Sequence, residues 1–255
     1  MFLPKTDRIK LLAKKFPDVI EHLGVIFDKP TNVYIDFANV KHWQKKLCWH
    51  IDLKRLKQLF DSFDTVKIIK FYYGTLENDL LENKYTKTAT ECGYEVKTKL
   101  VKVMNWSIDV SGIDLGSPVV LSNFIAKPFL YKLDVETIEF LNAKLLEMNR
   151  GGTKALKVLK CNFDVEIGRD MLLDYGLGSI ENFVLWSGDS DFADPIQQLI
   201  DDGKKVMIFA VARRISVELG QSKAGIFDIR KIREFICRSK ELSTEITADF
   251  KKNAL

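Results

Sequence analysis

Short, continuous apolar runs alternate with segments of helical periodicity along most of this chain. The continuous runs predict buried strands at residues 32–36, 66–74, 94–102, 183–186 and 205–212. Apolar positions three and four residues apart predict helices at residues 52–62, 78–91, 164–175, 192–201 and 215–219. We expect Asp52 to cap the first of these helices and Gly93 to end the second. The alternation of strands and helices favours a three-layer α/β/α fold with a mostly parallel central sheet.

Two segments fall outside this alternation. Residues 1–30 place Ile9, Leu12 and Phe16 at helical spacing, which predicts an N-terminal helical extension. Residues 105–153 carry short extended pieces with several glycines and prolines, followed by a predicted helix at residues 134–149. This second segment is typical of an insertion into a domain, because the strand and helix rhythm resumes after it.

The predicted organisation is therefore one α/β domain with additions. The domain spans residues 31–236 and contains the insertion at about 105–153. The extension at residues 1–30 precedes it, and a polar tail at residues 237–255 follows it. We expect residues 229–237 to close the sheet region.

Two of the predicted strands lead into aspartates. Asp36 is the last residue of the strand at residues 32–36, and Asp189 and Asp191 closely follow the strand at residues 183–186. The carboxyl ends of parallel strands lie at one edge of a sheet, where ligands bind at the point of strand-order reversal. We therefore expect these two strands to be central neighbours at that point.

Asp164 is the third acidic position of interest, because it begins the helix predicted at residues 164–175. Carboxylates brought close together repel one another unless a cation joins them. Mg²⁺ and Mn²⁺ prefer oxygen ligands of this kind. The pattern predicts a divalent metal site formed by Asp36, Asp164 and Asp189, with Asp191 as a fourth ligand that binds directly or through water.

A structural alternative exists for part of this set. Asp189 or Asp191 would cap the helix that follows them, which explains one of these residues. It does not explain why aspartates follow two separate strands. Asp170 and Asp194 are weaker candidates: Asp170 lies almost two helical turns beyond Asp164 and would instead pair with a lysine, and Asp194 would lie on a helix surface.

Composition excludes several other classes of protein. The chain has 255 residues, of which 46% are hydrophobic, and no apolar run is long enough to span a membrane. The N-terminus lacks the apolar core of a signal peptide. The four cysteines form no Cys-x-x-Cys pair and the three histidines lack ligand spacing, which disfavours a zinc cluster and favours idle thiols in a reducing cytoplasm. The net charge of +4 is compatible with a nucleic-acid partner and equally with a solvated lysine-rich surface.

Three motifs in order give the chain a family resemblance. They are Asp36-Phe37-Ala38-Asn39, the segment 164–170, and Ser187-Gly188-Asp189-Ser190-Asp191-Phe192 with the following Pro195-Ile196. Together they resemble the NYN family, the LabA-like branch of the PIN-domain nucleases, over about residues 31–104 and 155–236. The chain departs from that family at Cys161-Asn162, where a lysine and a glycine are common, and at Ala224-Gly225.

This resemblance implies a metal-dependent ribonuclease, which we expect to be an endonuclease, with Mg²⁺ or Mn²⁺ held by Asp36, Asp164, Asp189 and Asp191. In such an enzyme the metal activates a water for attack on an RNA phosphodiester bond. The RNA would be single-stranded or structured, and no membrane is involved.

Residues near the predicted site are candidates for contact with RNA. They are Asn39, Lys41, Trp43, Ser187, Arg213 and Arg214. Basic and aromatic side chains suit a phosphate backbone and a stacked base. The structural alternative is that the residues after Asp36 form a solvated helix start with Trp43 packed in the core. Lys97 and Lys99 would line a groove or face water.

Two other functions remain in competition. The same fold would serve as a non-catalytic module that binds RNA or protein, although the intact set of aspartates argues against it. A phosphatase of the haloacid-dehalogenase type would need Asp-x-Asp at the first strand, where this chain has Asp36-Phe37-Ala38. The sequence also leaves open whether the chain forms a homodimer.

Overall fold

The chain forms two compact units. The computed structural model describes residues 1–75, 80–107, 120–151, 155–160, 163–211 and 215–253. One unit comprises Met1–Leu100 and Asn162–Leu255, and the other comprises Val101–Cys161. All four predicted metal carboxylates belong to the first unit, and the insertion predicted at residues 105–153 lies within the second.

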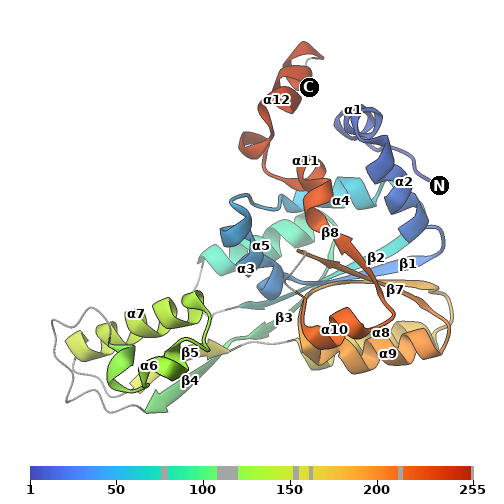
Figure 1. The fold of residues 1–255 in the computed structure, drawn as a ribbon. Coiled ribbons are helices and arrows are strands. Elements are labelled where there is room, and N and C mark those ends of the chain that lie inside the picture. Colours follow the sequence, from blue (N-terminus) through green and yellow to red (C-terminus); the bar gives the residue numbers. More distant parts are fainter. Residues whose placement is uncertain (76–79, 108–119, 152–154, 161–162, 212–214, 254–255) are drawn as a thin grey trace. The chain divides into compact units, whose positions relative to one another are not determined.

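The first unit is built on a six-stranded sheet in which every neighbouring pair is parallel (Figure 1). Its order is β3 (Glu95–Leu100), β2 (Val66–Thr75), β1 (Thr31–Asp36), β6 (Asn182–Trp186), β7 (Lys205–Ala210) and β8 (Gly225–Asp228). The strand order reverses between β1 and β6, which pair from Thr31 opposite Asn182 to Ile35 opposite Trp186. The predicted fold class is confirmed, and the two strands that lead into aspartates are central neighbours.

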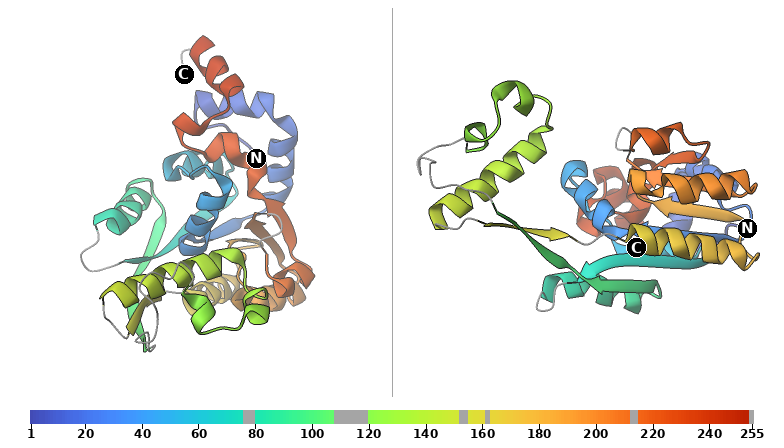
Figure 2. Two further views of the ribbon diagram at one scale, coloured as in Figure 1. Left: turned by 60° about the vertical axis from the view of Figure 1, so that its left-hand side comes forward. Right: turned by 90° about the horizontal axis from the view of Figure 1, so that it is seen from below.

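Helices cover both faces of this sheet. Figure 1 and the right-hand view of Figure 2 show α8 (Asp164–Gly176) and α9 (Ala193–Asp201) side by side along one face. The opposite face carries α3 (Phe37–Leu47), α4 (Leu53–Phe60) and α5 (Leu80–Glu91). The other helical elements of this unit are α1 (Asp7–Lys15), α2 (Pro17–Ile26), η2 (Ser190–Phe192), α10 (Val217–Gln221), η3 (Ile229–Ile232), α11 (Arg233–Ile236), η4 (Ser239–Glu241) and α12 (Thr244–Lys252).

Three elements differ from the sequence predictions. The N-terminal extension is two helices, because Pro17 has no amide hydrogen to continue α1 and instead begins α2. The strand that closes the sheet is β8, and residues 229–236 are helical. Their buried apolar positions at Ile229, Ile232 and Phe235 recur every three residues, which is a helical spacing. The helix α3 directly after Asp36 is not among the helices that periodicity predicts, and it agrees with the alternative of a helix start after Asp36.

Large aromatic side chains fill the space between the sheet and α4. Phe209 on β7 is fully buried, and its ring centroid lies 4.7 Å from that of Phe227 and 5.7 Å from that of Trp186. Phe27 and Phe60 complete the cluster from the helical side at 6.2 and 6.3 Å from Phe209. This packing fixes β6 and β7 beneath the helical layer and so supports the strand that leads to Asp189.

The second unit has its own small core. Its strands β4 (Lys102–Ser107) and β5 (Ala155–Lys160) pair antiparallel, and its helical elements are η1 (Leu121–Asn123), α6 (Lys127–Leu130) and α7 (Val135–Gly151). Val120, Leu121, Leu130, Leu145 and Met148 are buried against one another. None of the helices described in either unit combines the length and apolar character that a bilayer crossing requires.

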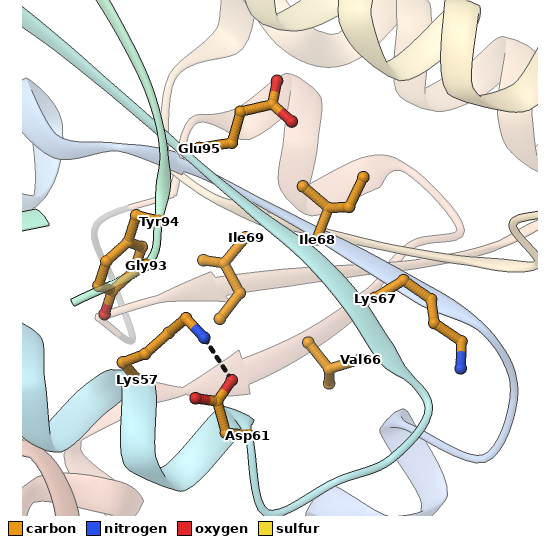
Figure 3. A pocket seen from close by; sticks show the side chains of 9 residues that line it. All are labelled: Lys57, Asp61, Val66, Lys67, Ile68, Ile69, Gly93, Tyr94 and Glu95. Carbon is orange, nitrogen blue, oxygen red and sulfur yellow. Dashed lines mark hydrogen bonds and ion pairs between the residues drawn. The ribbon is translucent and has the colours of Figure 1, made fainter. Parts of the chain in front are cut away.

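A pocket of about 350 Å³ lies at the amino end of β2 (Figure 3). It exists because β3 pairs with β2 only from Lys70 onward, so Val66–Ile69 has no strand neighbour on that side. Figure 3 shows Lys57 of α4 and Asp61, directly after that helix, joined by an ion pair at the pocket wall. The predicted metal carboxylates are at the carboxyl edge, so this pocket does not belong to their site.

The aromatic cluster gives a test of the fold. We expect Phe209→Ala to lower the free energy of unfolding by about 3–5 kcal/mol, because it leaves a cavity among four aromatic rings. Urea unfolding followed by circular dichroism measures this change. Leu177→Ala is the control, since Leu177 is 78% exposed and its truncation is expected to cost less than about 0.5 kcal/mol. Equal, small effects of both substitutions would contradict the packing described.

Candidate metal centre

Asp36 lies at the junction between β1 and α3. Its side chain is 8% exposed, and Oδ1 accepts a hydrogen bond from the backbone N–H of Asn39 at 3.3 Å, which caps α3. Oδ2 accepts a hydrogen bond from Ser187 Oγ at 3.2 Å. Burial raises the pKa of Asp36 to about 6 and the charge of Asp189 adds to the rise, although the hydrogen bonds from Asn39 and Ser187 oppose it.

Ser187 links the two central strand ends. It follows β6, is fully buried, and donates to Asp36 while its Oγ accepts from the backbone N–H of Asp189 at 3.3 Å. This hydroxyl therefore holds the loop after β6 against the end of β1. Ser187 is a predicted RNA contact, and in the structure its hydroxyl contacts two of the carboxylate residues, Asp36 and Asp189.

Asp189 and Asp191 lie on the turn that leads into α9. Asp189 Oδ1 accepts from the backbone N–H of Asp191 at 3.3 Å and so caps the short turn η2, whereas α9, the helix that the structural alternative concerns, has no side-chain cap. Asp189 is half-buried and Asp191 is exposed. A cap uses one carboxylate oxygen of Asp189 and leaves the other oxygen for a further contact.

Asp164 begins α8 and completes the group. One carboxylate oxygen from each of Asp164, Asp189 and Asp191 lies within 4.8 Å of the other two. Burial raises the pKa of Asp164 to about 6, and the negative charges of Asp189, Asp191 and Asp36 raise it further. Asp164 and the distant turn that carries Asp189 and Asp191 thus present three carboxylates to one point, with Asp36 close enough to act on that point electrostatically.

The carboxylate group fits a small divalent cation. Oxygen ligands lie at about 2.1 Å from Mg²⁺, so two ligands on opposite sides of the ion are about 4.2 Å apart. The oxygens of Asp164, Asp189 and Asp191 lie within a span of similar size. Carboxylate oxygens are also the donors that Mg²⁺ and Mn²⁺ prefer. Asp164, Asp189 and Asp191 are therefore the residues that could hold such an ion, with Asp36 beside them.

Close packing of α8 against α9 supports this arrangement. A methyl group placed on Gly168 would lie 3.4 Å from Cγ of Pro195, so the helices touch where α8 has no side chain. Gly168 is one turn after Asp164, and Pro195 is one turn after Asp191. The small residue thus lets the start of α8 approach the turn that carries Asp189 and Asp191.

The weaker acidic candidates lie away from this group. Asp170 is 6% exposed and accepts hydrogen bonds from Tyr72 and from Arg169, so its basic neighbour is an arginine where a lysine was expected. Asp194 is exposed on the surface of α9. Neither belongs to the group of carboxylates within 4.8 Å.

The candidates for RNA contact are spread over different environments. Lys41 Nζ donates to the Tyr73 hydroxyl at 2.5 Å and lies 5.4 Å from the ring centroid of Tyr85. Trp43 is 5% exposed, which favours the alternative that it packs in the core. Asn39 is half-buried, and its backbone N–H donates a hydrogen bond to Asp36, the N-cap of α3. Arg213 and Arg214 lie outside the described residues.

The two lysines of β3 form ion pairs. Lys97 pairs with Glu95 at 2.9 Å, and Lys99 pairs with Glu166 of α8 at 2.7 Å. Lys99 Nζ also lies 4.7 Å from the ring centroid of Phe163, directly before Asp164. The Lys99 side chain therefore contacts the first turn of α8.

The raised pKa values predict how the metal-free protein responds to pH. The pKa of Asp36 is about 6 in the folded protein, whereas its ordinary value is 3.8. The raised pKa of Asp36 therefore stabilises the folded state below pH 3.8, and this contribution is lost as pH rises through 6. We expect Asp36→Asn, which keeps the helix cap, to raise the melting temperature at pH 7.5 in EDTA and to change it little near pH 4. A lower melting temperature than wild type at pH 7.5 would contradict this electrostatic account.

Metal binding is expected to compete with protons at the same carboxylates. We expect Mn²⁺ to raise the melting temperature at pH 7.5 and to raise it much less at pH 5, because Asp36 and Asp164 have pKa values of about 6. Asp164→Asn should abolish the gain. Asp201→Asn, which removes the same charge at the exposed end of α9, is the control and should retain it. A gain of equal size at both pH values would place the metal elsewhere.

The comparisons with known proteins concern part of the chain. No curated protein matches it. A Vibrio parahaemolyticus protein of unknown function is similar in structure, with 16% identity, 82% of this chain and 95% of that chain covered, and a TM-score of 0.43, a level from which no conclusion follows. The family model of the NYN domain matches residues 147–225, which include Asp164, Asp189 and Asp191. The resemblance to the NYN domain family is thereby confirmed, and the LabA-like branch stays a prediction.

Proposed function

We propose that this chain is a metal-dependent ribonuclease that cuts RNA at internal phosphodiester bonds. The observation that carries the proposal is the convergence of Asp164, Asp189 and Asp191 within 4.8 Å, beside the buried Asp36. The match to the NYN domain supports it, because that domain belongs to a nuclease superfamily. Cytoplasmic location and RNA as substrate are parts of the same proposal.

The electrostatics of the site favour cation binding over a purely structural role. The charges that shift the pKa of Asp164 belong to Asp189, Asp191 and Asp36, and each of them raises it. Such a group is destabilising at neutral pH unless a positive charge joins it. A cap at Asp189 accounts for one of these residues and leaves the position of Asp164 unexplained.

The chain's own residues would divide the work of the reaction. Asp164, Asp189 and Asp191 would hold Mg²⁺ or Mn²⁺, and a bound ion of this kind lowers the pKa of water and neutralises phosphate charge. Asp36 keeps its carboxylate oriented through Asn39 and Ser187. Lys41 near the start of α3, and Arg213 and Arg214 after β7, are the proposed contacts to the phosphate backbone.

End-labelled single-stranded RNA tests this proposal. We expect cleavage in Mg²⁺ or Mn²⁺, none in EDTA, and labelled products of many lengths, because an endonuclease cuts at internal positions. Asp189→Asn should lower the cleavage rate by at least about 100-fold, because it weakens a ligand of the ion. Asp201→Asn is the matched control for charge and should cut at the wild-type rate.

Two outcomes would contradict the proposal. RNA binding without cleavage in any metal, unchanged by Asp189→Asn, would favour the non-catalytic binding module. Cleavage that persists in EDTA, or that Asp189→Asn leaves intact, would point to another site or to a contaminating nuclease.

A further inference from the structure

Helix α8 buries acidic side chains against the sheet. Its buried positions include Ile167, Asp170, Met171 and Asp174, which follow the spacing of one helical face. Two of these four residues are aspartates, where an ordinary core-facing helix would carry apolar residues. Both aspartates therefore need polar partners on the strands beneath them.

Asp174 receives those partners from β1 and β2. Its Oδ2 accepts hydrogen bonds from Asn32 Nδ2 at 2.8 Å and from the Tyr34 hydroxyl at 2.6 Å. Lys70 Nζ lies 2.8 Å from the same oxygen and 3.0 Å from Oδ1. All four side chains are buried, Lys70 at 6% and Asp174 at 7% exposure. This is a buried ion pair with both carboxylate oxygens satisfied.

Asp170 is held in a similar way one turn closer to the metal centre. The Tyr72 hydroxyl donates to its Oδ2 at 2.9 Å, and Arg169 donates to its Oδ1. Burial and the charge of Asp170 raise the pKa of Tyr72 well above its usual range, so the phenol keeps the proton that it donates. Burial alone would raise the pKa of Asp170, but the hydrogen bonds from Arg169 and Tyr72 hold it below its usual value.

These contacts lead along α8 to the carboxylate group. Asn32, Tyr34 and Asp36 alternate along β1 and so share the face that α8 covers. Tyr72 lies opposite Asp36 in the neighbouring strand. Asp164 precedes Asp170 by six residues, or about 9 Å along the helix axis. The hydrogen bonds of Asp170 and Asp174 thus connect the strands beside Asp36 to the helix that begins at Asp164.

Directional contacts of this kind determine where a helix lies along its own axis. A buried ion pair adds little net stability compared with apolar packing, because desolvation of the charges offsets their attraction. Its hydrogen bonds, however, are satisfied in one register and lost when the helix slides or rotates. Metal ligands tolerate displacements of only about 0.2 Å, so the register of α8 controls whether Asp164 reaches the ion.

We propose that Tyr72 and Tyr34, with Lys70, are positioning residues that fix α8 through Asp170 and Asp174 and thereby place Asp164 in the metal centre. This inference rests on the proposed function only in needing the metal site. It assigns a role in metal affinity to buried side chains that touch neither metal nor substrate.

Two tyrosine substitutions separate positioning from stability. Tyr72→Phe removes the hydroxyl that donates to Asp170 on α8. Tyr94→Phe removes another buried hydroxyl, which donates to the backbone carbonyl of Leu53 at 2.7 Å on the opposite face of the sheet. Both variants lose one buried hydrogen bond, and only the first touches α8. Tyr34→Phe serves as a second α8 variant in case Tyr72→Phe folds poorly.

The measurement is Mn²⁺ binding by the full chain, followed through the electron paramagnetic resonance signal of free Mn²⁺ below the melting temperature. We expect Tyr72→Phe and Tyr34→Phe to weaken Mn²⁺ binding by about tenfold, as changes outside the ligand set commonly do. Tyr94→Phe is expected to bind Mn²⁺ as wild type does, even if its melting temperature falls as far as that of the α8 variants.

The outcomes distinguish this inference from the proposed function. Equal Mn²⁺ affinity in wild type, Tyr72→Phe, Tyr34→Phe and Tyr94→Phe would overturn the positioning role and leave the metal site intact. Equal weakening in all three variants would show a general loss of stability and would also overturn it. No Mn²⁺ binding by wild type would instead refute the metal site on which the proposed function depends.

Discussion

The parallel pairing of β1 with β6 is the constraint on which the site depends. It ends two central strands at one edge of the sheet, so Asp36 and the loop carrying Asp189 meet although more than 150 residues separate them. The two faces of the sheet then contribute to the site in different ways. The aromatic cluster around Phe209 anchors β6 and β7 from one face, and α8 brings Asp164 to the same edge from the other. The carboxylates come from the end of β1, the start of α8 and the turn after β6, and the register of the central pair brings β1 and that turn together.

Concentrating carboxylates at this edge carries an electrostatic cost that the rest of the fold must offset. Burial is the main reason why the pKa values of Asp36 and Asp164 are raised, and the charges of the neighbouring carboxylates raise them further. Hydrogen bonds from Asn39 and Ser187 keep the Asp36 carboxylate oriented despite this electrostatic cost. Aromatic packing and buried polar contacts hold the surrounding elements in place. On the proposed function, the repulsion that destabilises the site without a cation would favour the binding of one, so metal affinity would come at the expense of stability.

The sequence predicted the parts of this structure that follow from local pattern. The fold class, the neighbouring strands that lead into Asp36 and Asp189, and the caps at Asp52 and Gly93 follow from periodicity and residue type, and the structure has them. Residues 229–236 were assigned to the sheet region because their apolar spacing is short and ambiguous. The burial of Asp170 and Asp174 was not foreseen, since a charged residue in a helix is ordinarily solvated. Both aspartates can be buried because Tyr34, Lys70 and Tyr72 lie beneath α8 and hydrogen-bond to them. The positions of these three residues depend on the register of the strands.

The most direct test of this account is a crystal structure of the protein grown with Mn²⁺, with the anomalous scattering of manganese measured. The account predicts an anomalous peak within coordination distance, about 2.2 Å, of carboxylate oxygens of Asp164 and Asp189. Asp191 should lie within reach of the ion directly or through one water. A well-ordered carboxylate group with no peak, or a peak bound by other residues, would contradict the claim that this edge of the sheet is a metal centre.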